Sequence, residues 1–285
     1  MQQTVLITGC SSGIGRAAAH MFLEADWRVY ATARNPADIE TLGERGCQIA
    51  TLDVTDGDDI DRVVDRIEDE SGSVSCLVNN AGFGQFGAIE DIPTSQVHRQ
   101  FDVNLYGPHR LIRAVLPKMR ENEAGTIINI SSVAGQVSFP TGGVYAGSKA
   151  ALEAMSDALR NEVAPYDIDV VIIEPGPVET AFPDRAAREF QDETKENSIA
   201  DDTQQIERSG AYESLYELLT DTKLVGGGGF GAVSAERVAE DILDAASSTS
   251  PQPRYQTGAT ARVGVLARFV PSTWRDTLYQ KLQSL

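Results

Sequence analysis

The sequence predicts a single α/β domain with a doubly wound parallel sheet, the Rossmann fold, and helices on both faces of that sheet. Strand-like and helix-like stretches alternate through the first two thirds of the chain, which is typical of a parallel sheet covered by helices. A glycine-rich turn joins the first predicted strand to the first helix. The length of 285 residues suits one domain of this kind, so we assign 1–285 to it.

The predicted strands are short apolar runs, and the predicted helices are longer periodic segments. Strands are expected at Thr4–Thr8, Arg28–Ala33, Cys47–Leu52, Ser75–Val78, Gly125–Ile130 and Asp169–Ile173. Helices are expected at Gly13–Ala25, Asp56–Glu70, His98–Arg120, Tyr145–Glu162 and Ser234–Ser247. Either Thr55 or Asp56 would cap the second helix and Ser234 the last, because such side chains accept hydrogen bonds from free helical N–H groups.

The last third of the chain is less regular. Residues 179–221 contain 12 acidic and 4 basic side chains and follow the breaker Pro175-Gly176-Pro177. We expect the wider stretch 179–232 to be an insertion that covers the substrate. Residues 261–285 form a C-terminal tail that is apolar enough to pack on this subunit, on a neighbour or on a membrane surface.

Charge and composition argue against several classes of function. The chain has 42 acidic and 24 basic residues and a formal net charge of −18, so its surface repels nucleic acid and anionic membranes. It lacks a run of roughly 20 apolar residues that could span a membrane, and it does not start like a secretory signal. We therefore expect a cytoplasmic protein. An acidic surface with only five lysines also fits a salty cytoplasm.

The cysteines and histidines do not suggest a metal site. Cys10, Cys47 and Cys76 have neither disulfide nor zinc-ligand spacing, so we expect them to be small buried side chains. The three histidines form no HxH or HxxxH pair, which argues against histidine ligation of a metal.

The turn after the first strand has the features of a phosphate-binding loop. It reads Thr8-Gly9-Cys10-Ser11-Ser12-Gly13-Ile14-Gly15. Gly9 would make the tight turn, Gly13 would let the backbone approach a pyrophosphate, and Gly15 would let the helix pack closely on the sheet. The N-terminus of that helix favours negative charge.

The GxxxGxG spacing of this turn, together with Asn79-Asn80-Ala81-Gly82 after the fourth strand, resembles the short-chain dehydrogenase/reductase family. The resemblance implies a nicotinamide cofactor. It places Asp53-Val54 against the adenine, and Asn80, Ala81 and Gly82 beside the strand and the ribose. In the segment Pro175-Gly176-Pro177-Val178-Glu179-Thr180, it places the backbone at Val178 and the side chain of Thr180 near the carboxamide or pyrophosphate.

The end of the second strand discriminates between the two nicotinamide cofactors. Enzymes that bind NAD usually have an acidic residue there, about 20 residues past the glycine turn, which holds the ribose hydroxyls. Here Ala33 occupies that position and Arg34 follows it. A guanidinium can pair with the 2′-phosphate of NADP, and Ser11 and Ser12 add hydroxyl donors. We expect NADP(H) to be preferred, with NAD(H) as the alternative.

Tyr145 and Lys149 are the expected proton-transfer pair. A free tyrosine has a pKa of about 10, too high for efficient proton transfer near neutrality. Four residues apart on a helix, the two side chains would share one face, and the ammonium would stabilise the phenolate. The resemblance adds Ser132, 13 residues before Tyr145, as the group that orients the carbonyl. It adds Asn104 as the fourth catalytic residue and lets Lys149 bind the nicotinamide ribose.

These residues predict an NADP(H)-dependent oxidoreductase that transfers a hydride between the nicotinamide and a small-molecule carbonyl or secondary alcohol, with Tyr145 as acid/base and no metal. The alternatives are an NAD-dependent alcohol dehydrogenase of the same family and a non-catalytic NADP(H)-binding regulator.

Within the family, the Gly-Cys-Ser-Ser-Gly turn and the Val-Tyr-Ala-Thr-Ala-Arg strand resemble hydroxysteroid and retinoid dehydrogenases. Residues 137–144 and 179–223 would determine the substrate, for which we expect a hydrophobic ketone or alcohol. The family also implies a homodimer or homotetramer formed through helices 98–120 and 145–162.

Overall fold

Seven parallel strands form the central sheet of the computed structural model, which describes residues 2–179, 209–216 and 231–283. Their order is β3-β2-β1-β4-β5-β6-β9, so the chain winds outward in both directions from the β1–β4 pair, as the doubly wound fold requires. The strands are β1 (Thr4–Ile7), β2 (Arg28–Ala33), β3 (Gln48–Thr51), β4 (Cys76–Asn79), β5 (Gly125–Ile130), β6 (Ile168–Pro175) and β9 (Arg254–Thr257). A separate short pair is formed by β7 (Val178–Glu179) and β8 (Val233–Ser234).

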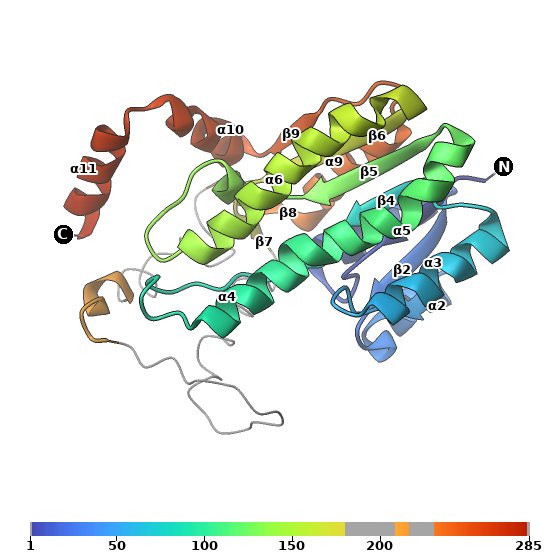
Figure 1. Ribbon diagram of the computed structural model, residues 1–285, viewed down its shortest axis with the longest axis horizontal. Coiled ribbons are helices and arrows are strands. Elements are labelled where there is room, and N and C mark those ends of the chain that lie inside the picture. Colours follow the sequence, from blue (N-terminus) through green and yellow to red (C-terminus); the bar gives the residue numbers. More distant parts are fainter. Residues whose placement is uncertain (1, 180–208, 217–230, 284–285) are drawn as a thin grey trace.

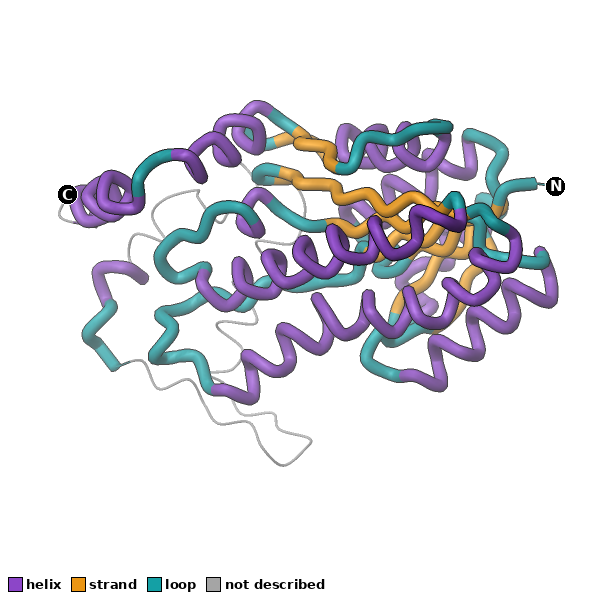
Figure 2. Tube along the Cα trace, turned by 45° about the horizontal axis from the view of Figure 1, so that its top comes forward, coloured by secondary structure: helices purple, strands orange, loops and turns teal. Residues whose placement is uncertain are grey.

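Helices cover both faces of this sheet (Figures 1 and 2). They are α1 (Gly13–Glu24), α2 (Glu40–Glu44), α3 (Gly57–Ser71), α4 (Thr94–Phe101), α5 (Gly107–Asn122), α6 (Gly143–Val163), α9 (Ala235–Ser247), α10 (Ala259–Leu266) and α11 (Ser272–Gln283). Successive strand residues face opposite sides: Val5 and Ile7 join the core with α1 and α9, whereas Leu6 joins the core with α3, α5 and α6. The predicted fold class is therefore confirmed.

Two predicted helix caps are also confirmed. The Asp56 carboxylate accepts hydrogen bonds from the backbone N–H groups of Asp58 and Asp59, at 2.9 and 3.2 Å, so Asp56 rather than Thr55 caps α3. The Ser234 hydroxyl accepts one from Arg237 N at 3.2 Å at the start of α9.

The long helix expected at His98–Arg120 is interrupted. It consists of α4 and α5, joined by one π-helical turn, η2, at Asp102–Tyr106. A π-helical turn fits an extra residue into a helix and occurs frequently at functional sites. The apolar period continues through this region, which is why the sequence predicts one uninterrupted helix.

The seventh strand, β9, is not among the predicted strands. It pairs with β6 at the edge of the sheet, and its four residues, Arg-Tyr-Gln-Thr, form no apolar run. An edge strand needs only one neighbour for its backbone hydrogen bonds, and it can therefore form from polar residues. The three cysteines are free and buried, as expected.

Most of the predicted insertion 179–232 lies outside the described residues, including Thr180. The described stretch 209–216 packs on the loop after β4 through the buried side chain of Tyr216. The Tyr216 hydroxyl donates to the Asp91 carboxylate at 2.7 Å and accepts from Ala88 N at 3.1 Å. Residues 209–216 therefore lie close to Phe86, which lines the cleft described below.

The C-terminal tail packs on its own subunit only in part. Ala261 of α10 is buried, whereas Leu266, Phe269 and Trp274 are exposed, and α11 extends away from the sheet (Figure 1). Within the described part of the chain, no helix is long and apolar enough to cross a membrane.

Candidate active site

A cleft of about 1020 Å³ lies at the carboxyl ends of the strands, where open parallel sheets bind their ligands. Its walls come from the segments that follow β1 to β6. The predicted site residues that line it are Gly9, Ser11, Ser12, Gly13, Ile14, Arg34, Asp53, Val54, Asn80, Ala81, Gly82, Ser132, Tyr145, Lys149, Pro175, Gly176 and Val178. Gly15 and Asn104 are not among the lining residues, and Thr180 lies outside the described residues.

The glycine turn has a backbone shape that side chains would prevent. Gly9 and Gly13 have φ angles of 72° and 57°, in the left-handed region that favours glycine. A Cβ atom on Gly9 would lie 2.9 Å from Ala81 Cα, and one on Gly15 would lie 2.5 Å from the Gly9 carbonyl oxygen. The turn, the first helix and the segment after β4 therefore pack so closely that no residue larger than glycine fits at Gly9 or Gly15.

Thr8 and Asn80 lock the glycine turn to the segment after β4. The Thr8 hydroxyl accepts hydrogen bonds from the backbone N–H groups of Asn80 and Ala81, at 3.1 and 3.0 Å. The Asn80 amide donates to the carbonyl oxygens of Thr8 and Gly9, at 2.8 and 3.1 Å. The Asn80 side chain thus braces the turn.

Arg34 lies on the cleft wall immediately after β2, with an exposed side chain. Asp38 lines the same part of the cleft, a carboxylate that the sequence analysis did not consider. Its Oδ1 accepts a hydrogen bond from Asn35 Nδ2 at 3.3 Å. A second guanidinium is also near, because Arg16 Nη2 donates to the Asp38 carbonyl oxygen.

Tyr145 is buried in the cleft wall, with 8% of its surface exposed. Burial disfavours the phenolate and raises the pKa of Tyr145 to about 12, while a hydrogen bond with the Ser132 side chain acts in the opposite direction. The neighbouring Ser131 points elsewhere, because its hydroxyl donates to Glu153 Oε1 at 2.7 Å. Of the two serines, Ser132 is therefore the one in contact with Tyr145.

Lys149 lies one helical turn beyond Tyr145. Its ammonium is 5.9 Å from the centre of the Tyr145 ring and donates to the Ile130 carbonyl oxygen at 2.8 Å. Burial lowers the pKa of Lys149 to about 8, although the Glu153 carboxylate opposes this change. The net pKa of Tyr145 is therefore raised rather than lowered, because burial is the largest effect on it.

Asn104 is buried in the middle of the π-helical turn, and its side chain holds the Phe83 backbone against α6. Its Oδ1 accepts from Phe83 N at 3.1 Å, and its Nδ2 donates to Phe83 O at 2.9 Å and to Ser148 Oγ at 3.2 Å. One helical turn earlier, Gln100 accepts from Gln85 N at 2.6 Å and donates to Phe83 O at 2.8 Å. The two amides together fix residues 83–85, part of which lines the cleft.

An aromatic wall adjoins Tyr145, and the sequence analysis found only part of it. The Phe86 ring lies 5.5 Å from the Tyr145 ring and 6.2 Å from that of Phe139, measured between ring centres. Phe139 lies within the predicted substrate-determining stretch 137–144, but Phe86 was not predicted. The signal for it was the sequence Gly-Phe-Gly-Gln-Phe-Gly directly after Ala81.

Comparisons with known proteins agree with this architecture. Residues 3–190 match the family model described as short chain dehydrogenase. The chain is 33% identical over 279 residues to the probable short-chain type dehydrogenase/reductase VdlC of Helicobacter pylori, with 96% of each chain covered. It is 35% identical over 184 residues to an NADPH-dependent 3-dehydrocapnine reductase of Ornithobacterium rhinotracheale, with 61% of this chain and 65% of the relative covered. A short-chain dehydrogenase structure from Streptomyces avermitilis superposes with a TM-score of 0.80 at 32% identity, over 100% of this chain and 98% of the other.

Proposed function

The chain belongs to the short-chain dehydrogenase/reductase family, and on that premise we propose that it uses NADPH to reduce an apolar ketone or aldehyde, with Tyr145 as proton donor. One contact supports this above all, the hydrogen bond between the Ser132 and Tyr145 side chains in the cleft wall. The aromatic wall of Phe86 and Phe139 beside that contact favours an apolar substrate.

In this mechanism the cofactor supplies the hydride that the carbonyl carbon receives. Tyr145 donates its proton to the carbonyl oxygen, and the Ser132 hydroxyl hydrogen-bonds the same oxygen. The raised pKa of Tyr145 keeps the phenol protonated at neutral pH, which suits a proton donor. Lys149 stabilises the phenolate that forms, and Asn104 keeps the wall of residues 83–85 in place.

The residues that line the cleft suit a nicotinamide adenine dinucleotide. The backbone from Gly9 to Ile14 and the N-terminus of α1 would hold the pyrophosphate. We assign Asp53 and Val54 to the adenine; Asn80, Ala81, Gly82 and Lys149 to the riboses; and Pro175, Gly176, Val178 and Thr180 to the nicotinamide end. Arg34 would pair with the 2′-phosphate, and NAD(H) is the alternative. The similarity to a relative named as NADPH-dependent supports this preference.

Replacing Arg34 by aspartate is expected to reverse the cofactor preference. Because a hydrogen bond to a charged group contributes about 1.5 to 3 kcal/mol, kcat/KM for NADPH should fall by about 10- to 100-fold, while that for NADH stays the same or rises. The measurement is kcat/KM for both cofactors with one ketone. Arg45→Asp, an equal charge change outside the cleft, is the control. An unchanged ratio in Arg34→Asp would refute the role of Arg34.

Carbonyl reduction is expected to decline above a pH of about 8. The pKa of Lys149 is lowered to about 8, so its ammonium is present below that pH and lost above it, whereas the Tyr145 phenol stays protonated until about pH 12. The measurement is kcat/KM for reduction between pH 6 and pH 10, at saturating NADPH. A profile that stays flat through this range would contradict the assignment to Lys149.

An assay that measures NADPH consumption with each compound in a panel of apolar ketones and aldehydes distinguishes an enzyme from a non-catalytic regulator. The regulator would bind NADPH without turning over any member of the panel.

Two further assignments belong to the same proposal. The stretch 179–232 covers the substrate, and the packing of residues 209–216 on the loop beside Phe86 supports this. Helices α4–α5 and α6 form a homodimer or homotetramer interface.

A further inference from the structure

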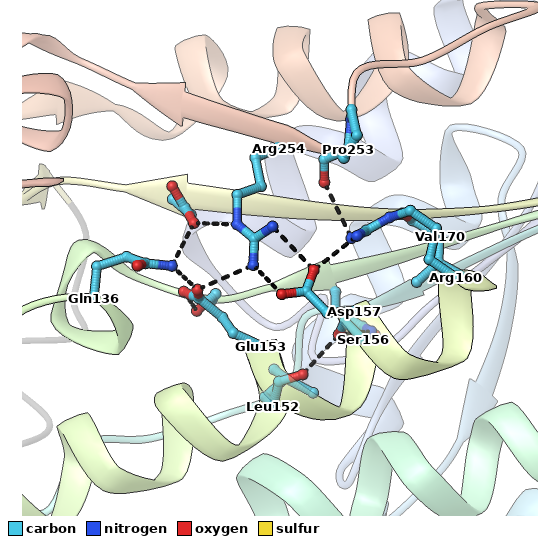
Figure 3. A network of polar contacts seen from close by, with 12 residues as sticks. Gln136, Leu152, Glu153, Ser156, Asp157, Arg160, Val170, Pro253 and Arg254 are labelled. Carbon is cyan, nitrogen blue, oxygen red and sulfur yellow. Dashed lines mark hydrogen bonds and ion pairs between the residues drawn. The ribbon is translucent and has the colours of Figure 1, made fainter. Parts of the chain in front are cut away.

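Three acidic side chains, two of them buried, gather around Arg254: Glu153, Asp157 and Glu174 (Figure 3). Tyr145, Lys149, Glu153 and Asp157 follow one another at intervals of four residues along α6, so they share one face of the helix. Glu153 and Asp157 both contact Arg254, which reaches across from β9. The proton-transfer pair and this cluster are therefore successive turns of one helix stripe.

Glu153 is held in place by groups from several parts of the chain. It is 4% exposed, and its Oε1 accepts the Ser131 hydroxyl at 2.7 Å. Gln136 Nε2 contacts its Oε2, and Arg254 Nη2 lies 3.6 Å from that oxygen. Because Ser131 directly precedes Ser132, Glu153 is linked to both sides of the proposed site, through the helix to Lys149 and through Ser131 to Ser132.

Glu174 on β6 is a second buried carboxyl group beside Glu153. It is 0% exposed, and its Oε1 accepts Arg254 Nε and Gln136 Nε2, both at 3.0 Å. Among the described residues, its Oε2 is buried without a hydrogen-bond partner. A buried carboxylate oxygen without a donor is costly, so Glu174 is an unfavourable neighbour for a second ionised carboxyl group.

Among the described residues, Arg254 is the only cation within ion-pair distance of Glu153 or Glu174, at 3.6 and 3.0 Å, and it also pairs with Asp157. The other charged groups on the surrounding elements are Lys149 one turn earlier on α6, Arg160, which pairs with Asp157, and Arg268, which donates to Gln136 Oε1 at 2.6 Å. Asp157 occupies both terminal nitrogens of Arg254, at 2.9 and 2.7 Å. Burial, with Glu174 adding to it, raises the pKa of Glu153, because two adjacent buried carboxylates resist ionising together.

We propose that Glu153 is a positioning residue for the reaction proposed above, and that it shares one proton with Glu174, so that the charge on this pair controls the charge on Lys149. Ionised Glu153 stabilises the ammonium one helical turn away. When the pair is protonated, the ammonium loses that support. Glu153 thereby acts on Tyr145 only through Lys149 and on Ser132 only through Ser131.

The test is an NMR titration of lysine side chains, which does not depend on turnover. The chain has only five lysines, so selectively labelled lysine gives few signals, and Lys149→Met identifies the one from Lys149. In the unaltered protein, we expect the chemical shift of this signal to change with pH in two steps. The main inflection reports the titration of Lys149 itself, and a minor inflection at lower pH reports the titration of the carboxyl pair.

Three substitutions separate positioning from structural support. Glu153→Gln should abolish the minor inflection and move the main one to lower pH by about one unit, because a nearby negative charge is lost. Glu174→Gln should move the minor inflection to lower pH. Asp157→Asn, which frees Arg254 but leaves the Glu153 side chain unchanged, should leave the main inflection in place and lower the melting temperature.

The inference is overturned if Glu153→Gln leaves the main inflection where it was, or if Asp157→Asn moves that inflection equally. The pH profile of carbonyl reduction should shift with the main inflection. If no carbonyl compound is reduced, the proposed function fails, and the titration still decides the role of Glu153.

Discussion

Replacing Tyr145 by phenylalanine is expected to lower kcat for carbonyl reduction by about 10²- to 10⁴-fold, the usual contribution of a positioned general acid. The substitution removes one hydroxyl group and its contact with Ser132. The ring should stay packed against Phe86, so the affinity for NADPH should hardly change. Single-turnover reduction and a fluorescence titration with NADPH measure the two quantities separately.

Tyr255→Phe is the matched control for this experiment. Tyr255 lies on the edge strand β9, away from the cleft, and its hydroxyl accepts a hydrogen bond from Gln252 N at 3.3 Å. That variant should reduce carbonyl compounds at the unaltered rate. The role of Tyr145 is refuted if Tyr145→Phe keeps more than about a tenth of the original rate, because a loss that small is below the range for general acid catalysis.

Replacing Lys149 by methionine is expected to lower kcat/KM by about 10²-fold or more and to weaken NADPH binding as well. Methionine fills similar space but cannot donate to the Ile130 carbonyl oxygen or stabilise the phenolate. The combination distinguishes this variant from Tyr145→Phe, in which cofactor affinity is retained. The two effects are read from steady-state rates and from the NADPH titration.

Lys118→Met provides the control, because Lys118 forms an ion pair with Glu121 on the surface of α5 at 2.7 Å and lies outside the cleft. A surface pair of this kind contributes little, so rate and affinity should persist. If Lys149→Met binds NADPH as tightly as the unaltered protein does, Lys149 does not hold the ribose. If it also retains the rate, the proton-transfer assignment fails with it.

Local patterns made the fold and much of the cleft predictable. The glycines of the turn are required by backbone conformation, and the strands of the sheet are apolar runs, so both features appear in a short window of sequence. The edge strand β9 was missed because its residues are polar. Phe86 was missed because its role depends on Phe139 and Tyr145, which are more than 50 residues away in the chain.

The properties that depend on three-dimensional environment could not be predicted in the same way. Spacing alone suggested that Lys149 lowers the pKa of Tyr145, but the degree of burial decides the direction, and burial follows from the packing of several elements. The acidic cluster was even less predictable from the sequence, because Glu153, Glu174 and Arg254 come from three different elements, α6, β6 and β9. No local pattern marks them as neighbours.

The π-helical turn at Asp102–Tyr106 makes the number of residues in this helix, and not only their identity, a determinant of the site. Each residue advances a helix by about 1.5 Å and rotates it by about 100°. One residue more or fewer in the turn would therefore rotate the helix after it relative to Gln100, and Gln100 and Asn104 could not both hold the Phe83 backbone as they now do. In aligned relatives, a gap at this place would be more informative about the site than any single substitution nearby.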